Sequence, residues 1–117
     1  MVSSIGRFLR KLRIDNGEIL REMAYKLGVS SAFLSAVENN KKKMPEKWIL
    51  KLQELYSLSP EQIDELKVAL EESKDVIEIN VRDASGESRR LAVTFARQFN
   101  TLDEDTAEKL LKILNKT

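Results

Sequence analysis

The side chains that could do chemistry gather between residues 24 and 43 of the chain. Small and hydroxyl-bearing residues take the outward positions of a predicted helix over residues 31–39, and three lysines follow that helix directly. Serine hydroxyls can donate or accept hydrogen bonds, whereas alanine offers only a methyl group. This chemistry is typical of molecular recognition. The residues at the outward positions are Ser31, Ala32, Ser35, Ala36 and Asn39.

The surrounding residues predict two short helices joined by a tight turn. Ala24 is small enough for the following helix to cross close to its own, and Gly28 supplies the left-handed conformation that ends the helix containing Ala24. Ser30 stands where the helix over residues 31–39 needs an N-cap, while Leu34 and Val37 share the inward face of that helix. The spacing favours a helix-turn-helix, whose second helix lies in the major groove of DNA, over a generic helical hairpin.

Sequence segments in and around this motif carry a family resemblance. They are Leu9-Arg10-Lys11-Leu12-Arg13, Ala24 with Leu27-Gly28-Val29-Ser30, and Leu34-Ser35-Ala36-Val37-Glu38-Asn39. Over residues 5–72 the chain resembles the phage-repressor/Cro-type (XRE) helix-turn-helix domains. The resemblance implies a five-helix repressor-like fold that binds double-stranded DNA, and it leaves the operator sequence open.

The resemblance also implies roles for individual residues. Those implied to read base edges are Ser31, Ala32, Ser35 and Ala36. This set lacks the Gln, Asn or Arg that gives bidentate readout, so DNA shape would contribute to specificity. Those implied to bind phosphate are Arg21, Ser30, Asn39, Lys41, Lys42 and Lys43. For the lysine run, the alternative is a solvated loop.

Arg13 and Glu38 match a pair that, in the resembled family, ties the first helix to the end of the third. The resemblance implies a partly buried ion pair with a structural role, in which removal of one partner leaves the other charge uncompensated. Two roles stay open for Phe33: it could contact DNA, or it could cover the junction with the first helix.

Three features depart from the family pattern. Ile19 and Leu20 stand where a polar cap and a phosphate-binding Gln usually open the second helix. Glu18 occupies a position that is usually apolar. Asn40 replaces the usual Gly after the third helix, where Asn still tolerates the left-handed conformation.

Composition narrows the classes of function. The 117 residues include no His and no Cys, which removes disulfides, thiolate metal sites and His-containing triads. No nucleophile–base pair, metal cluster or phosphate loop stands out, so we expect no enzyme, no metal and no cofactor. Residues 1–58 hold 11 basic and 6 acidic residues, whereas residues 59–117 hold 9 basic and 13 acidic ones. A basic front half suits nucleic-acid binding.

The same composition bears on location. No apolar run approaches the length needed to cross a bilayer, and basic residues interrupt the region where a signal peptide would need an apolar stretch. We therefore expect a cytoplasmic protein with no membrane partner.

Apolar periodicity and capping residues predict a mainly α fold. Residues 1–73 are expected to form the DNA-binding domain, with helices from about 3 or 4 to 15, at 20–27, 31–39, from 45 onward and 60–73. Pro45 suits the first position of the fourth helix. Ser59-Pro60-Glu61-Gln62 is a capping box that starts the fifth.

Residues 74–117 are expected to form a dimerisation or partner-binding segment. Residues 76–82 alternate apolar and polar side chains, which predicts one β-strand with Ile77, Ile79 and Val81 as its apolar residues. Because the chain offers no second strand, we expect the same strand of another copy as its partner. The alternatives are an extended linker or pairing with a segment misread as helix. Two helices follow, at about residues 87–99 and after a capping box at Thr101-Leu102-Asp103-Glu104.

Two functions compete on these grounds. The first is a homodimeric, sequence-specific DNA-binding transcriptional regulator, most simply a repressor, that acts on a pseudo-palindromic operator. The second is an antitoxin or adaptor, in which residues 74–117 bind and neutralise a partner protein while the N-terminal domain regulates its own promoter. An adjacent toxin-like reading frame or a stable protein partner would favour the second.

Overall fold

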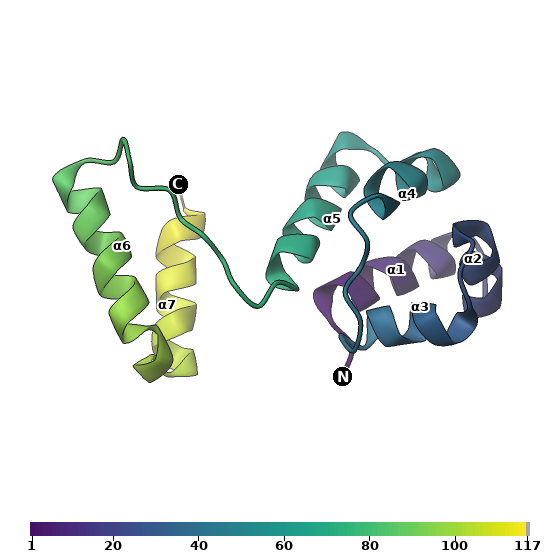
Figure 1. Ribbon diagram of the computed structural model, residues 1–117, viewed down its shortest axis with the longest axis horizontal. Coiled ribbons are helices and arrows are strands. Elements are labelled where there is room, and N and C mark those ends of the chain that lie inside the picture. Colours follow the sequence, from purple (N-terminus) through teal and green to yellow (C-terminus); the bar gives the residue numbers. More distant parts are fainter. Residues whose placement is uncertain (117) are drawn as a thin grey trace. The chain divides into compact units, whose positions relative to one another are not determined.

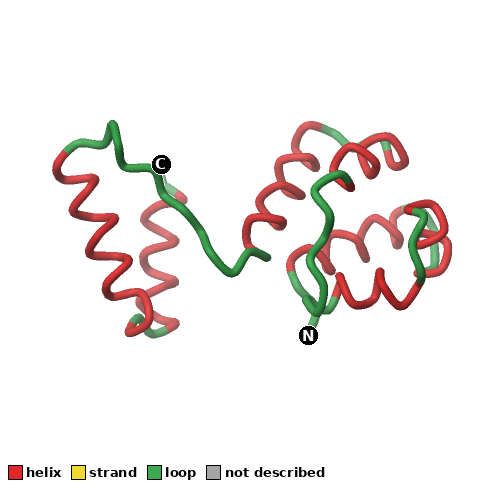
Figure 2. The backbone as a smooth tube through the Cα atoms, in the orientation of Figure 1, coloured by secondary structure: helices red, strands yellow, loops and turns green. Residues whose placement is uncertain are grey.

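The computed structural model describes residues 1–116, which form seven α-helices and one short 3₁₀ turn (Figure 1). The helices are α1 (Ser4–Asp15), α2 (Leu20–Leu27), α3 (Ser31–Glu38), α4 (Trp48–Tyr56), α5 (Pro60–Glu72), α6 (Gly86–Gln98) and α7 (Glu104–Asn115), and the turn is η1 (Phe99–Thr101). The predicted mainly α fold is confirmed, and these residues contain no strand (Figure 2). They divide into two compact units, Met1–Ile77 and a second that starts at Glu78.

Serine caps begin three helices of the first unit, and the sequence predicts two of these caps, Ser30 and Ser59. The Oγ atoms of Ser3, Ser30 and Ser59 each accept a backbone hydrogen bond from the residue three positions later, at 3.0–3.1 Å. Ser59 N–H also donates to Gln62 Oε1 at 2.9 Å, which completes the predicted capping box. Each serine cap satisfies an amide that the helix leaves unpaired and typically stabilises the protein by about 1 kcal/mol.

Left-handed residues follow α2 and α3. Gly28 has φ = 73° and Asn40 has φ = 60°, so both sequence predictions are confirmed. After Asn40 the chain turns back on α3, because Lys41 N–H donates to Ala36 O at 2.8 Å. This bond satisfies a carbonyl that the end of the helix would otherwise expose.

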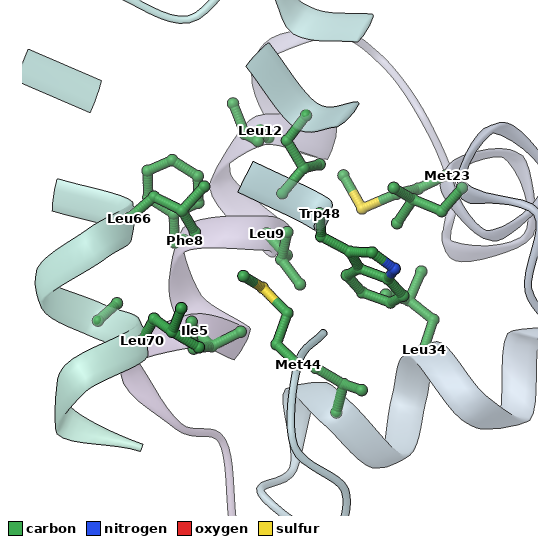
Figure 3. Close-up of a cluster of buried hydrophobic side chains, with 14 of the residues drawn as sticks. Ile5, Phe8, Leu9, Leu12, Met23, Leu34, Met44, Trp48, Leu66 and Leu70 are labelled. Atoms are coloured by element: carbon green, nitrogen blue, oxygen red, sulfur yellow. The ribbon is translucent and has the colours of Figure 1, made fainter. Parts of the chain in front are cut away.

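One hydrophobic core joins the first five helices. Leu9, Leu34, Leu52 and Leu66 belong to α1, α3, α4 and α5, and all four are fully buried. Figure 3 shows core side chains from these helices converging around Trp48, which is also buried. Burial of one large aliphatic or aromatic side chain stabilises the fold by roughly 1.5–3 kcal/mol. Because Leu34 of α3 is part of this core, the core holds α3 in place.

The fourth helix begins later than predicted. It starts at Trp48 rather than at Pro45. Trp48 N–H donates to Pro45 O and Ile49 N–H donates to Glu46 O, both at 3.1 Å. These bonds span three residues instead of four, so the chain forms a tighter turn before the regular helix starts.

The strand predicted over residues 76–82 is not found. In the described part of the chain these residues have no regular secondary structure and no partner strand. The expected strand residues Ile77 and Ile79 are exposed, and Val81 is half-buried. The alternation of apolar and polar side chains is therefore present without the backbone ladder that it usually accompanies.

Local hydrogen bonds occupy backbone groups at the end of this segment. Arg82 N–H donates to Asn80 Oδ1 at 3.0 Å, and Ala84 N–H donates to Val81 O at 3.1 Å, so the chain turns here. The Arg89 guanidinium of α6 donates to the same Val81 carbonyl at 2.7 Å. A turn and a side chain thus occupy Arg82 N–H and Val81 O, two backbone groups that a ladder could have used.

α6 and α7 lie side by side as an antiparallel hairpin (Figures 1 and 2). Ser85 caps α6 by accepting from Ser88 N–H at 3.1 Å. The predicted cap of α7 is wrong: Asp103, not Thr101, takes this role and accepts from Thr106 N–H at 2.7 Å. The Thr101 hydroxyl instead donates to the Gln98 carbonyl at 2.8 Å, because η1 continues the chain beyond α6.

Candidate nucleic-acid interface

α3 presents two different faces. Leu34 and Val37 are buried in the core, as their spacing predicts. The residues predicted to read base edges occupy other positions of the helix, with Ala32 exposed and Ser31, Ser35 and Ala36 half-buried. Small polar and methyl-bearing side chains therefore remain where another molecule can reach them.

A buried ion pair fastens the end of α3 to α1. Glu38, the last residue of α3, is 2% exposed. Arg13 holds it through two contacts: Nη2 donates to Oε1 at 3.0 Å, and Nη1 donates to Oε2. The predicted contact between Arg13 and Glu38 is present. Because loss of one partner would leave a buried charge uncompensated, the pair constrains where α3 lies.

Arg10 is a third member of this cluster that the sequence analysis missed. Its Nε donates to Glu38 Oε1 at 3.3 Å, although its side chain is 46% exposed. The sequence feature that could have predicted this contact is spacing, because Arg10 precedes Arg13 by three residues and so lies on the same face of the helix.

Phe33 packs against the core. Its ring meets the ring of Trp48 edge to face, with 6.0 Å between centroids and 74° between planes. Of the two roles that the sequence left open, the structure supports the packing role. The partner lies in α4 rather than at the junction with α1, so Phe33 helps to fix α3 against α4.

Three predicted phosphate-binding cations lie on the surface of the first unit. Arg21 is exposed in the first turn of α2, and Lys41 and Lys42 are exposed just after α3. Within residues 1–116 these three side chains have no hydrogen-bonding or ionic partner. Each is thus a solvated cation that an anionic ligand could neutralise without breaking an existing contact.

Lys43 differs from the two lysines before it. Its Nζ donates to the carbonyl of Ser73 and lies 3.4 Å from Asp75 Oδ1, so it holds the end of α5. A phosphate contact by Lys43 would have to compete with these partners. The run of three lysines does not show this difference, because Ser73 and Asp75 are thirty residues away or more.

Two further predicted phosphate-binding residues serve as helix caps. Asn39 Nδ2 donates to Ser35 O at 2.9 Å at the end of α3, and Ser30 Oγ accepts from Phe33 N–H at its start. The Ser30 hydroxyl retains its own proton for donation. Both side chains therefore stabilise α3 directly, whatever they contact beyond it.

A second polar cluster, missed by the sequence analysis, holds α2. The side chain of Glu18 is 7% exposed and accepts hydrogen bonds from Lys26 Nζ and, at 2.6 Å, from the Tyr56 hydroxyl. Burial raises the pKa of the Glu18 carboxyl, but the bonds from Lys26 and Tyr56 prevail, so its pKa lies below its ordinary value. Burial and then the Glu18 carboxylate raise the pKa of Tyr56 well above its usual value. The only signal in the sequence was a carboxylate at a position that is usually apolar in the family that the chain resembles.

The two ends of α2 are satisfied in unexpected ways. Ile19 offers no side-chain acceptor at the start, and its own N–H donates to Glu22 Oε1 at 3.0 Å. At the other end, Lys51 Nζ donates to Leu27 O at 2.8 Å. A cation at a helix C-terminus is favourable because it complements the helix dipole.

Comparisons with protein families, with curated proteins and with solved structures found no match. Within residues 1–116, no helix has both the length and the apolar character that spanning a membrane requires.

Proposed function

We propose that residues 1–73 bind double-stranded DNA and that the protein is a sequence-specific transcriptional regulator of the phage-repressor/Cro-type (XRE) helix-turn-helix kind. The observation that carries this proposal is the surface around α3. Its accessible positions hold small polar and methyl-bearing side chains, the exposed cations Lys41 and Lys42 follow it, and Arg21 is exposed on α2 in the same unit. A rigid helix of this kind fits the major groove, while flanking cations contact phosphate.

Side-chain chemistry suggests which residues would contact bases and which would contact phosphates. Ser31 and Ser35 would hydrogen-bond base edges, and the methyl groups of Ala32 and Ala36 would contact thymine methyls. Such contacts discriminate weakly, so the shape of the DNA would supply part of the specificity. Arg21, Lys41 and Lys42 would provide most of the affinity and make binding depend on salt.

We further propose that two copies act together as a repressor in the cytoplasm. A two-fold dimer places two recognition helices about 34 Å apart, one turn of B-DNA, and so matches a pseudo-palindromic operator. The buried contacts of Glu38 hold α3 within each copy, as a recognition helix of fixed position requires.

Binding of the full chain to duplexes selected from a random pool, followed by fluorescence anisotropy, tests the proposal. Ala32→Glu places a carboxylate on the exposed surface of α3, where it would repel phosphate, and should weaken binding roughly tenfold or more. The matched control is Gln53→Glu on the exposed surface of α4, which should leave affinity unchanged. Absence of duplex binding at low salt, or equal losses in the two variants, would contradict the proposal.

The second unit favours one competing function. Its helices α6 and α7 contain no buried residue, and Leu91 is 67% exposed. Exposed apolar surface of this kind marks a protein interface, which an antitoxin or adaptor would use against its partner. This alternative predicts that the purified product of an adjacent co-transcribed reading frame forms a stoichiometric complex with the full chain, and that co-expression relieves its toxicity.

A further inference from the structure

The hairpin of α6 and α7 lacks a core of its own. Neither helix contains a buried residue, although together they carry Leu91, Phe95, Leu110 and Ile113. A unit of about 40 residues rarely folds alone without disulfides, a metal or association with another chain. The chain has no cysteine to supply a disulfide. Another surface should therefore complete this unit.

The incomplete surface is continuous along the hairpin. At one end, Ile79, Leu91 and Ile113 line an almost wholly apolar hollow of about 420 Å³ between the helices. At the other end, Phe99, Ala107 and Leu111 line a second hollow. Phe95 and Leu110 line both. One apolar face thus extends from the start of α6 to the turn that joins α6 to α7.

The charges of the hairpin are distributed unevenly along its length. We call the start of α6 and the end of α7 the open end, and the region around the connecting turn the tip. The charged residues at the open end are Glu87, Arg89, Arg90, Lys112 and Lys116, which leaves it positive. Those at the tip are Arg97, Asp103, Glu104, Asp105, Glu108 and Lys109, which leaves it negative. The charges of one hairpin therefore complement those of a second copy that runs in the opposite direction, with open end against tip.

We infer that a second copy of this chain covers the apolar face, with its α6–α7 hairpin antiparallel to the first. A two-fold axis across the hairpins would place each open end against the other copy's tip, so that opposite charges meet. Four helices then enclose one core, in which Leu91, Phe95 and Leu110 of both copies pack together. This inference deepens the proposed function by naming the surface that joins two copies, but it does not require DNA binding.

The mass of the full chain in solution, measured by light scattering without DNA, tests the inference first. The wild type should have about twice the monomer mass of 13.4 kDa. Phe95→Glu should give a monomer, because the carboxylate would lie in the shared core. Val93→Glu is the matched control, since Val93 is 52% exposed and lines neither hollow. Circular dichroism shows whether either variant has lost helix.

Charge exchange tests the orientation without altering the core. R90E/K112E makes the open end negative, and E104K/E108K makes the tip positive. Each variant alone should raise the dissociation constant of the dimer by about tenfold, because like charges then meet. An equimolar mixture should restore wild-type affinity, since the altered ends complement each other. A parallel dimer would instead leave R90E/K112E no weaker than the wild type.

A monomeric wild-type chain at about 100 μM would overturn the inference, as would a dimer that survives Phe95→Glu with its helix content intact. A mixture that fails to restore the dimer would also overturn it. None of these outcomes depends on DNA, so a chain that dimerises as inferred but binds no duplex would contradict the proposed function alone.

Discussion

The backbone of Gly6 in α1 lies against the carbonyl group of Glu38, the last residue of α3. A Cβ atom placed on Gly6 would overlap that carbonyl oxygen and would lie 2.8 Å from Val2 Cγ1. The same carbonyl accepts a hydrogen bond from Ser3 N–H at 3.0 Å. The start of α1 thus contacts the end of α3 closely, while Arg13 binds the Glu38 carboxylate farther along α1.

Gly6→Ala should destabilise the first unit by about 1–2 kcal/mol. Alanine would favour the helix by about 0.5–1 kcal/mol, but the overlap with the backbone of Glu38 costs typically 1–3 kcal/mol and cannot be relieved by a side-chain rotation. Urea unfolding measures the change. Gly86→Ala is the control, because nothing lies within 4 Å of a Cβ at Gly86, and this variant should be neutral or slightly stabilised.

Arg13→Met should cost about 3–5 kcal/mol in the free energy of unfolding, because Glu38 would lose its principal buried partner. Arg10→Met removes a contact to the same carboxylate from a side chain that is 46% exposed, so it should cost less than about 1 kcal/mol. Equal losses would show that the two arginines share the buried charge evenly. Urea unfolding of both variants makes this comparison.

Glu18→Gln should reduce the dependence of stability on pH in the acidic range. The pKa of Glu18 is lower in the folded chain than its ordinary value of 4.5. The contribution of Glu18 to the free energy of unfolding is therefore fully present above pH 4.5, and it is lost as the pH falls through the lowered pKa of the folded chain. The difference in unfolding free energy between wild type and variant, measured at successive pH values, should shrink over that range.

Tyr56→Phe should show a pH dependence of stability between those of the wild type and Glu18→Gln. It removes the hydroxyl that donates to Glu18 but leaves Lys26 in place. The variant should retain part of the acid dependence, since one of the two bonds that lower the pKa of Glu18 remains. A pH profile identical to that of the wild type would contradict the role given to Tyr56.

Lys42→Gln should weaken DNA binding on all sequences and reduce the slope of log affinity against log salt by about 1, as expected for one lost phosphate contact. Lys43→Gln should change the slope less, because Lys43 is occupied by Ser73 and Asp75. Lys67→Gln, on the exposed surface of α5, removes the same charge elsewhere and should have no effect on the slope. Equal changes for Lys42 and Lys43 would contradict this distinction.

The sequence by itself determined the local structure of the first unit. Apolar spacing predicted α1, α2, α3 and α5, and the predicted caps Ser30 and Ser59 fixed where two of them begin. These features depend on residues within a few positions of one another, so the chain reveals them without knowledge of the fold. The contact between Arg13 and Glu38 was also predictable, but only through the family resemblance.

Only the tertiary structure decided what depends on distant partners. The alternation over residues 76–82 predicted a strand, yet none is found there, and Asn80 and Arg89 instead bond backbone groups at the end of the segment. Likewise, Lys43 resembles Lys42 in the sequence but reaches Ser73 in the fold. Local patterns specify which conformations a segment favours, whereas its hydrogen-bond partners depend on which other segments the core brings near.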